Sequence, residues 1–215
     1  MSMIYVSQTA NSILIDHLQR AGHQVHLIAP TDRTYDPVSA HPDIYLCGMG
    51  PGGSVFFGDP SKIGPKYPQN IVYNAACTGA FFIHNLTYTD QALLTQAESM
   101  EKIHVRQGYA KCNIVIVDET SIITADRGIY KACSGKLDVL LVDPGHVALQ
   151  GFPYGFLGGA SGRVGDEIIF NGNLKSHPDY EKIRSFIESR RLKVKYFSQY
   201  ALEDIGSIIQ GAPAD

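Results

Sequence analysis

Residues 112–124, Cys112-Asn113-Ile114-Val115-Ile116-Val117-Asp118-Glu119-Thr120-Ser121-Ile122-Ile123-Thr124, decide the fold of this chain. Two apolar runs rich in β-branched residues flank a polar break at 118–120, which predicts a β-hairpin. Asp126 can then cap a short helix over 127–133, and the apolar run 138–142 is typical of a buried strand. This stretch therefore predicts a unit of strand, strand, helix and strand.

The same order of elements returns directly afterwards. The second copy consists of strands over 159–164 and 167–170 around a Gly165-Asp166 turn, a helix over 178–190 and a strand over 193–197. Direct repetition of a supersecondary unit indicates duplication, so the rest of the chain should contain further copies.

Three more copies precede these two. One is predicted as a strand over 80–84, a helix over 91–100 and a strand over 102–106. Another is a hairpin of 44–47 with 54–57 and a closing strand over 70–73, in which prolines replace the helix: Pro60, Pro65 and Pro68. The first comprises a strand over 3–6, a helix over 11–21 and a strand over 25–28, without a first strand. The run Ile205–Ile209 has no partner in its own unit, so we expect it to pair with residues 3–6.

Five such units, closed by the end of the chain, resemble the pentein superfamily of guanidino-group-modifying enzymes along the whole sequence. The resemblance implies an α/β fold, a five-bladed αβ-propeller of ββαβ units with pseudo-fivefold symmetry whose last strand closes on the first unit. We expect a single domain over residues 1–209 and a frayed tail over 210–215. The alternative is a doubly wound sheet opened by residues 1–30, but residues 7–11 lack the glycine-rich phosphate turn of that fold.

The pentein enzymes hold a guanidinium with carboxylates and attack it with a cysteine from the last strand, assisted by a histidine. His146 occupies the place of the family's histidine and is our first catalytic candidate. The alternative is a turn histidine, because the preceding Pro144-Gly145 is an ordinary turn dipeptide. Lys111 and Asn113 stand where the family has an acid, and Ser207 stands near the place of the cysteine. Because an amide and an ammonium cannot hold a guanidinium as a carboxylate does, we do not expect ordinary guanidine hydrolysis.

Other residues could serve a divergent site. Cys77 lies in a connector of small residues and could act as a nucleophile with His84 or His146, although a core thiol is the alternative. Arg163, beside Ser161, could bind a carboxylate while Asp204 binds an amine. The alternative is hairpin-turn chemistry, for which residues 158–159 and 163–166 are suited in any case. The candidate ligand-binding residues are therefore Asn113, Lys111, Ser161, Arg163, Asp204 and Ser207.

The composition limits the classes of function. The chain has 215 residues, 44% of them hydrophobic and 18% charged, and a formal net charge of -3. It lacks the concentrated Lys and Arg that nucleic-acid binding requires, and no apolar run is long enough to span a membrane. Its four cysteines show no paired short spacing, and no His-x-x-x-His or Cys-x-x-Cys pair occurs. We therefore expect a reduced cytoplasmic protein without cofactor or metal.

Three functions remain open from the sequence. The first is binding of a small polar metabolite, an amino acid or a guanidine- or amidine-like compound, in a central channel without cysteine-dependent chemistry. The second is a divergent amidinohydrolase- or amidinotransferase-like enzyme that uses His146 with Cys77. The third is a non-enzymatic interaction module. The loop over 151–155, rich in glycine and aromatic residues, favours a site close to His146 because such loops often cover ligand sites.

Overall fold

The structure, a computed structural model, describes residues 2–211. In this part of the chain the strands form five small sheets, four with three strands and one with two. Their strands, sheet by sheet, are β14 (Ile209–Gly211), β1 (Met3–Ser7) and β2 (Gln24–Ile28); β3 (Leu46–Gly48) and β4 (Val55–Phe57); β5 (Ala76–Cys77), β6 (Phe81–His84) and β7 (Glu101–His104); β8 (Ile114–Ile116), β9 (Ser121–Thr124) and β10 (Asp138–Leu141); and β11 (Ser161–Val164), β12 (Glu167–Phe170) and β13 (Lys193–Lys195).

The four three-stranded sheets share one pairing pattern. Each central strand pairs antiparallel with one neighbour and parallel with the other, as β9 does with β8 and β10. The parallel pair is joined by a helix, because parallel neighbours need a crossover connection. These crossover helices are α1 (Ser12–Arg20), α3 (Gln91–Gln96), α5 (Arg127–Cys133) and α6 (Tyr180–Glu188).

Side-chain caps fix where the helices begin. The Asp126 carboxylate accepts hydrogen bonds from the backbone N–H groups of Gly128 (2.7 Å) and Ile129 (2.8 Å) at the start of α5. Asp90 caps α3 in the same way. Such caps satisfy N–H groups that have no partner inside the helix. The shorter helices are α2 (Pro42–Tyr45) and α4 (Ala110–Asn113), with 3₁₀ turns at Asp36–Val38, Pro60–Lys62 and Leu174–Ser176.

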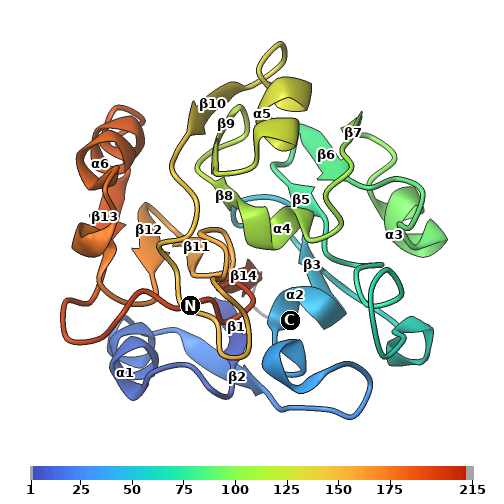
Figure 1. The fold of residues 1–215 in the computed structure, drawn as a ribbon, viewed down its shortest axis with the longest axis horizontal. Helices are drawn as coiled ribbons and strands as arrows, with labels where there is room; N and C mark the ends of the chain where they lie inside the picture. Colours follow the sequence, from blue (N-terminus) through green and yellow to red (C-terminus); the bar gives the residue numbers. More distant parts are fainter. Residues whose placement is uncertain (1, 212–215) are drawn as a thin grey trace.

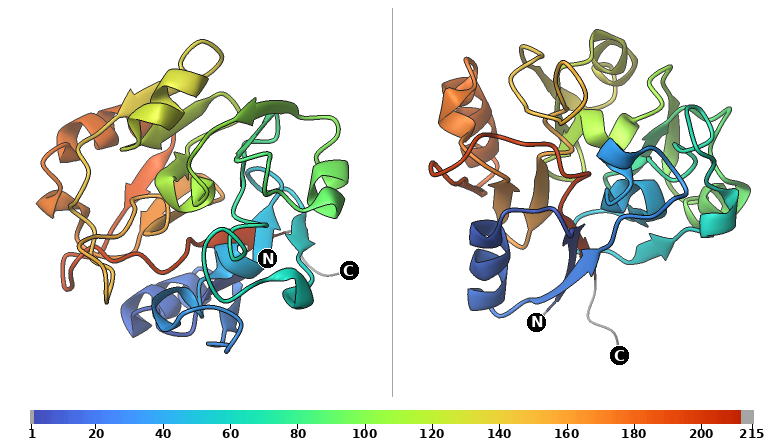
Figure 2. Two further views of the ribbon diagram at one scale, coloured as in Figure 1. Left: turned by 45° about the vertical axis from the view of Figure 1, so that its right-hand side comes forward. Right: turned by 60° about the horizontal axis from the view of Figure 1, so that its bottom comes forward.

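The five sheets surround the middle of the molecule in chain order, as the sequence colours in Figure 1 show, with α2, α4 and β14 near the centre. The views in Figure 2 show the crossover helices towards the outside. The second and fourth units begin in the same way, with a short helix that leads directly into a strand: α2 into β3, and α4 into β8. Polar side chains from distant parts of the sequence are thereby brought together in the middle.

The end of the chain pairs with its beginning. β14 runs antiparallel to β1, with Met3 opposite Gly211 and Tyr5 opposite Ile209. The predicted pairing partner of the first strand is therefore confirmed, but the strand starts later than expected. Only Ile209 of the predicted run belongs to it, and Gln210 and Gly211, which we assigned to the tail, lie in the strand. Residues 212–215 of that expected tail lie outside the described residues.

Three other expectations about secondary structure are wrong. Ile44 and Tyr45, expected in the first strand of the second unit's hairpin, lie in the helical turn α2, and the strand β3 begins only at Leu46. Residues 70–73 form turns instead of a closing strand, with hydrogen bonds from Ile71 N to Pro68 O and from Asn74 N to Ile71 O. The second unit thus keeps only its hairpin. Cys112 and Asn113 belong to the helical turn α4 instead of the following strand, because the backbone N–H of Asn113 is bonded to Tyr109 O. The helix turns their side chains towards different neighbours from those an extended chain would reach.

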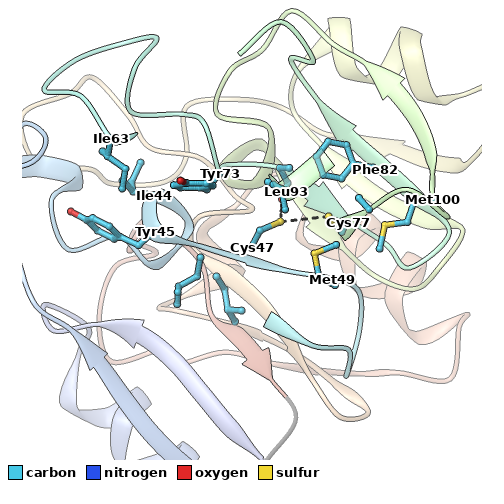
Figure 3. Packing of buried hydrophobic residues seen from close by; sticks show 14 of the residues in the cluster. Ile44, Tyr45, Cys47, Met49, Ile63, Tyr73, Cys77, Phe82, Leu93 and Met100 are labelled. Carbon is cyan, nitrogen blue, oxygen red and sulfur yellow. Dashed lines mark hydrogen bonds between the residues drawn. The ribbon is translucent and has the colours of Figure 1, made fainter. Parts of the chain in front are cut away.

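Apolar side chains between neighbouring sheets form the core. One cluster, drawn in Figure 3, joins residues of the second and third units, including Ile44, Tyr73, Phe82 and Leu93. Within it the Sγ atoms of Cys47 and Cys77 lie 3.5 Å apart, and both thiols are buried. None of the described helices is both long enough and apolar enough to cross a membrane.

Candidate functional site

A groove of about 630 Å³ lies between the fourth and fifth units. This volume is within the range of roughly 300–1,000 Å³ that is typical of small-molecule sites. One wall comes from the N-terminal end of α5 and from Asn113, and the other from the segment that follows β10 and from the start of α6. The polar and charged residues that line it are Gln107, Asn113, Asp126, Arg127, Asp143, His146, Tyr154, His177, Asp179 and Lys182.

Two histidines lie together in this groove. The rings of His146 and His177 are in edge-to-face contact, with centroids 5.1 Å apart. His177 Nδ1 accepts a hydrogen bond from the backbone N–H of Asp179 (3.1 Å), so Nε2 carries the proton that it donates to Asp143 O (3.1 Å). Burial, followed by the nearby His146, lowers the pKa of His177. His177 is therefore a fixed neutral imidazole, while His146 is exposed to a ligand in the groove.

Charged groups of both signs face the groove. Arg127 and His146 are exposed, and so is the carboxylate of Asp143. The other two acids already have structural roles, since Asp126 caps α5 and Asp179 pairs with Lys182 at 2.6 Å. Arg127 and Asp143 are thus the groups that remain for a ligand. Together they suit a molecule that carries a carboxylate and a cationic nitrogen, because guanidinium and carboxylate groups form strong charge-assisted hydrogen bonds.

The loop over residues 151–155 borders the same groove. Tyr154 and Gly155 line it, and the side chains of Phe152 and Tyr154 are 43% and 44% exposed. Exposed aromatic side chains at the rim of a cavity offer a ligand apolar contact area. The expected proximity of this loop to His146 is what the structure shows.

A second polar cluster is buried in the middle of the molecule. Asp43 Oδ2 accepts hydrogen bonds from the Ser207 hydroxyl (2.7 Å) and the Cys112 thiol (3.0 Å). Lys111 Nζ donates to Ser207 Oγ at 3.0 Å, and Asn74 Nδ2 donates to Cys112 Sγ at 3.4 Å. These residues come from the second, third, fourth and last segments of the chain, so only the tertiary structure brings them into contact.

Asp204 and His41 complete this cluster. The backbone N–H groups of Gly206 (3.0 Å) and Phe156 (2.9 Å) donate to the two oxygens of Asp204. His41 Nδ1 lies 3.8 Å from Asp204 Oδ1 and has no hydrogen-bond partner among the described residues, and neither has Asp43 Oδ1. Unpaired polar atoms are rare in protein interiors because burying them without a partner costs free energy.

Burial dominates the ionisation of the cluster. It raises the pKa of Asp43, and it raises the pKa of Asp204 to about 6. It lowers the pKa of Lys111 and of His41, and it raises the pKa of the Cys112 thiol well above its ordinary value. Each shift disfavours the charged form, as expected for groups removed from water.

The structure separates the site residues expected from the sequence into two groups. His146 and Asn113 line the groove. Lys111 and Ser207 are in hydrogen-bond contact in the buried cluster, to which Asp204 also belongs. Ser161 Oγ lies 3.3 Å from Gly158 O, the carbonyl that also accepts from Lys111. These residues do not converge on one cavity as a single channel site would require.

Arg163 and Cys77 line a smaller cavity of about 50 Å³ that reaches Lys111. Arg163 donates to the carbonyls of Val117 (2.7 Å) and Gly165 (3.1 Å), so it stabilises a turn. It does not belong to the buried cluster that contains Asp204. Cys77 is not beside His146, which lines the groove instead. Hydrogen bonding to Cys47, together with burial, raises the pKa of Cys77 well above its ordinary value. The two residues of the expected catalytic pair therefore lie in different cavities.

Sequence reasoning missed His41, Asp43, Arg127 and His177 and assigned Cys112 to the core. A signal for Asp43 was present in the repeat. Asp43 is the second residue of α2, and Lys111 is the second residue of α4, the corresponding helix. Aligning the units at these short helices would have placed both side chains on the same inner surface.

His84 has a structural role, and the pH dependence of stability tests that role. Its imidazole is enclosed, with Nδ1 2.7 Å from Thr89 Oγ1 and Nε2 3.1 Å from Gly108 O. Burial lowers its pKa to about 4. Since the unfolded chain takes up this proton near pH 6.5, the stability contributed by neutral His84 is present above pH 6.5 and is lost as the pH falls to about 4, up to about 3 kcal/mol.

We therefore expect the free energy of unfolding of His84→Gln to depend less on pH between 6.5 and 4 than that of the wild type. Urea titrations at several pH values would measure the difference, and the exposed His26 provides the control in His26→Gln. Identical slopes for His84→Gln and the wild type would show that His84 does not titrate in this range.

These features define a mixed α/β protein with a ligand-sized groove beside a buried polar cluster. Residues 53–209 match the family described as "Family of unknown function (DUF6873)", and the chain belongs to that family. None of the curated proteins and none of the solved structures matches the chain.

Proposed function

We propose that this protein is a pentein-like five-bladed αβ-propeller that binds a small polar metabolite, with a carboxylate and a cationic nitrogen, in the groove beside His146. The fold part of this proposal is supported by the repeated sheet pattern and by the pairing of β14 with β1. The observation that carries the ligand part is the groove itself, where Arg127 and Asp143 offer opposite charges next to the histidine pair.

The chemistry of the groove indicates how the ligand would lie. The Arg127 guanidinium binds the carboxylate, and Asp143 binds the amine, guanidine or amidine of the ligand. His146 can donate to or accept from a polar group between these ends, and Tyr154 covers the apolar part of the molecule. Amino acids and guanidino or amidino acids have this distribution of charge.

Isothermal titration calorimetry with a panel of amino acids and guanidino and amidino acids tests the proposal. For the ligand that binds wild-type protein, we expect Arg127→Gln to raise Kd by about 10–100-fold, because a charged hydrogen bond contributes roughly 1.5–3 kcal/mol. The matched control is Arg184→Gln, since Arg184 pairs with Glu181 on α6 and does not line the groove. Its Kd should equal that of the wild type.

Asp143→Asn tests recognition of the cationic end of the ligand independently of its carboxylate. It should weaken binding of compounds with a cationic nitrogen and leave binding of simple carboxylates unchanged. Absence of binding across the panel, or binding that is unaffected by both Arg127→Gln and Asp143→Asn, would exclude the groove as this site.

A further inference from the structure

Three potential metal ligands meet in the buried cluster. A ring nitrogen of His41, Cys112 Sγ and a carboxylate oxygen of Asp204 all lie within 4.8 Å of one another. The His41 Nδ1 to Asp204 Oδ1 distance is 3.8 Å. The three residues are only 4%, 3% and 4% exposed, so these atoms are held close together without access to bulk water.

His41 is an unsatisfied group aimed into this space. Its Nδ1 atom is buried and makes no hydrogen bond with any described residue, although a ring nitrogen normally donates or accepts one. The 3.8 Å separation from Asp204 is too long for a hydrogen bond. In the tautomer with the proton on Nε2, the lone pair of Nδ1 is available to a ligand bound beside Asp204.

We propose that His41, Cys112 and Asp204 bind a zinc ion in the middle of the molecule. Zinc takes imidazole nitrogen, thiolate sulfur and carboxylate oxygen in tetrahedral sites, with bonds of about 2.0–2.3 Å. Such bonds place neighbouring ligand atoms roughly 3.3–3.8 Å apart. The observed His41–Asp204 distance already meets this condition, and small side-chain shifts bring Cys112 into range. A water fills the fourth position, and Asp43, whose Oδ2 is 3.0 Å from Cys112 Sγ, lies next to the site.

The charges around the site balance when the metal is bound. The cluster holds two carboxylates, Asp43 and Asp204, but only one ammonium, that of Lys111. On binding, the S–H bond of Cys112 breaks, a Zn–S bond forms and the proton leaves to water. The thiolate and Asp204 then neutralise the two positive charges of the ion, and Asp43 neutralises Lys111. A buried site with balanced charge costs less than one with excess negative charge.

Outer contacts orient the three ligands. The backbone N–H groups of Gly206 and Phe156 fix the Asp204 carboxylate, and Asn74 Nδ2 lies 3.4 Å from Cys112 Sγ, where it can stabilise a thiolate. Such contacts position metal ligands and raise affinity. Gly206 has φ +70°, and a Cβ atom there would lie 2.1 Å from His41 Cβ. The C-terminal segment therefore packs directly against the His41 backbone.

The proposed zinc has a structural role that does not depend on the groove. His41 precedes α2, Cys112 lies in α4, and Asp204 lies in the segment that leads to β14. One ion would therefore cross-link the second unit, the fourth unit and the closing segment. The absence of short-range pairs such as Cys-x-x-Cys conceals the site from the sequence, because each ligand comes from a different unit.

Metal content tests the proposal directly. We expect wild-type protein, produced with zinc in the medium and purified without metal-affinity steps, to contain about one zinc per chain by plasma mass spectrometry. Protein that is unfolded with a chelator and refolded with Co²⁺ should show thiolate-to-cobalt charge-transfer absorption and tetrahedral d–d bands. The refolded metal-bound protein should also have a higher Tm than the metal-free protein.

Variants locate the ion. Cys112→Ser should abolish the charge-transfer band, and His41→Gln should lower Co²⁺ affinity by more than the roughly 10–100-fold that loss of an outer contact costs. Cys133→Ser is the matched control, because Cys133 is also a buried free thiol but lies in α5 outside the cluster. It should keep both the band and the metal content.

Two results would overturn the zinc site. The first is wild-type protein without metal after both production in zinc and refolding in Co²⁺. The second is a charge-transfer band that persists in Cys112→Ser or disappears in Cys133→Ser. If Cys112→Ser does not fold, the Co²⁺ affinity of His41→Gln and the metal content of the wild type still test the zinc site. Ligand titration in the groove is a separate measurement, so either proposal can fail alone.

Discussion

Gly162→Ala is expected to prevent stable folding. Gly162 lies in β11, and a Cβ atom there would be 1.9 Å from the carbonyl oxygen of Ile208 and 2.7 Å from its carbonyl carbon. The neighbouring Ser161 O accepts a hydrogen bond from Ile208 N at 3.0 Å, so this segment cannot move away without losing its attachment. Because the obstructing atoms are backbone, we expect a loss of more than about 3 kcal/mol.

The measurement is the yield of soluble protein and its urea midpoint. Gly135→Ala is the control, since a Cβ atom at Gly135 meets nothing within 4 Å and the substitution should change stability by less than about 0.5 kcal/mol. If Gly162→Ala is as stable as Gly135→Ala, then the C-terminal segment does not pack against β11.

Asp43→Leu is expected to have the next largest effect, about 3 kcal/mol or more. The substitution removes a shared acceptor of the Ser207 hydroxyl and the Cys112 thiol, and it removes the carboxylate that most favours the charged form of the buried Lys111. Removing one member of a buried polar set costs more than removing the set, because the remaining groups stay desolvated and unpaired. Urea denaturation in the presence of a chelator measures this loss separately from metal binding.

A double-mutant cycle distinguishes this cause from simple loss of packing. Asp43→Leu combined with Lys111→Met removes both charges and should be more stable than the sum of the single effects, by about 0.5–3 kcal/mol. Asp43→Asn, which retains an acceptor oxygen, should lose less than Asp43→Leu. Strict additivity of Asp43→Leu and Lys111→Met would show that the two side chains do not interact.

The regular units were predictable because their local signals agree with their tertiary surroundings. The run 121–124, the cap at Asp126 and helix 127–133 were predicted at the bounds that the structure shows. Helix 178–190 is shorter, as α6 ends at Glu188, since terminal turns depend on packing that periodicity does not report. Residues 70–73 have a strand-like composition but form turns, because the proline-rich second unit provides no helix to return the chain alongside its hairpin.

The site was predictable only in part. The position of His146 near an aromatic loop, and the polar character of Asn113, Lys111 and Ser207, could be read from their place in the repeat. The sequence did not show which of these residues lie together. The sequence indicated one channel, whereas His146 and Asn113 line the groove and Lys111 and Ser207 lie in the buried cluster. The helical turn α4 causes this division, because it directs residues 111 and 113 to different sides.

By itself, the sequence determined the repeated unit and the pairing of the last strand with the first, because alternating and buried apolar runs specify strands and an unpaired strand requires a partner. Only the tertiary structure decided which polar side chains meet. His41, Cys112 and Asp204 are separated along the chain by most of its length and share no local pattern. They become neighbours because five short sheets surround one small volume, where each approaching segment contributes a side chain that water can no longer reach.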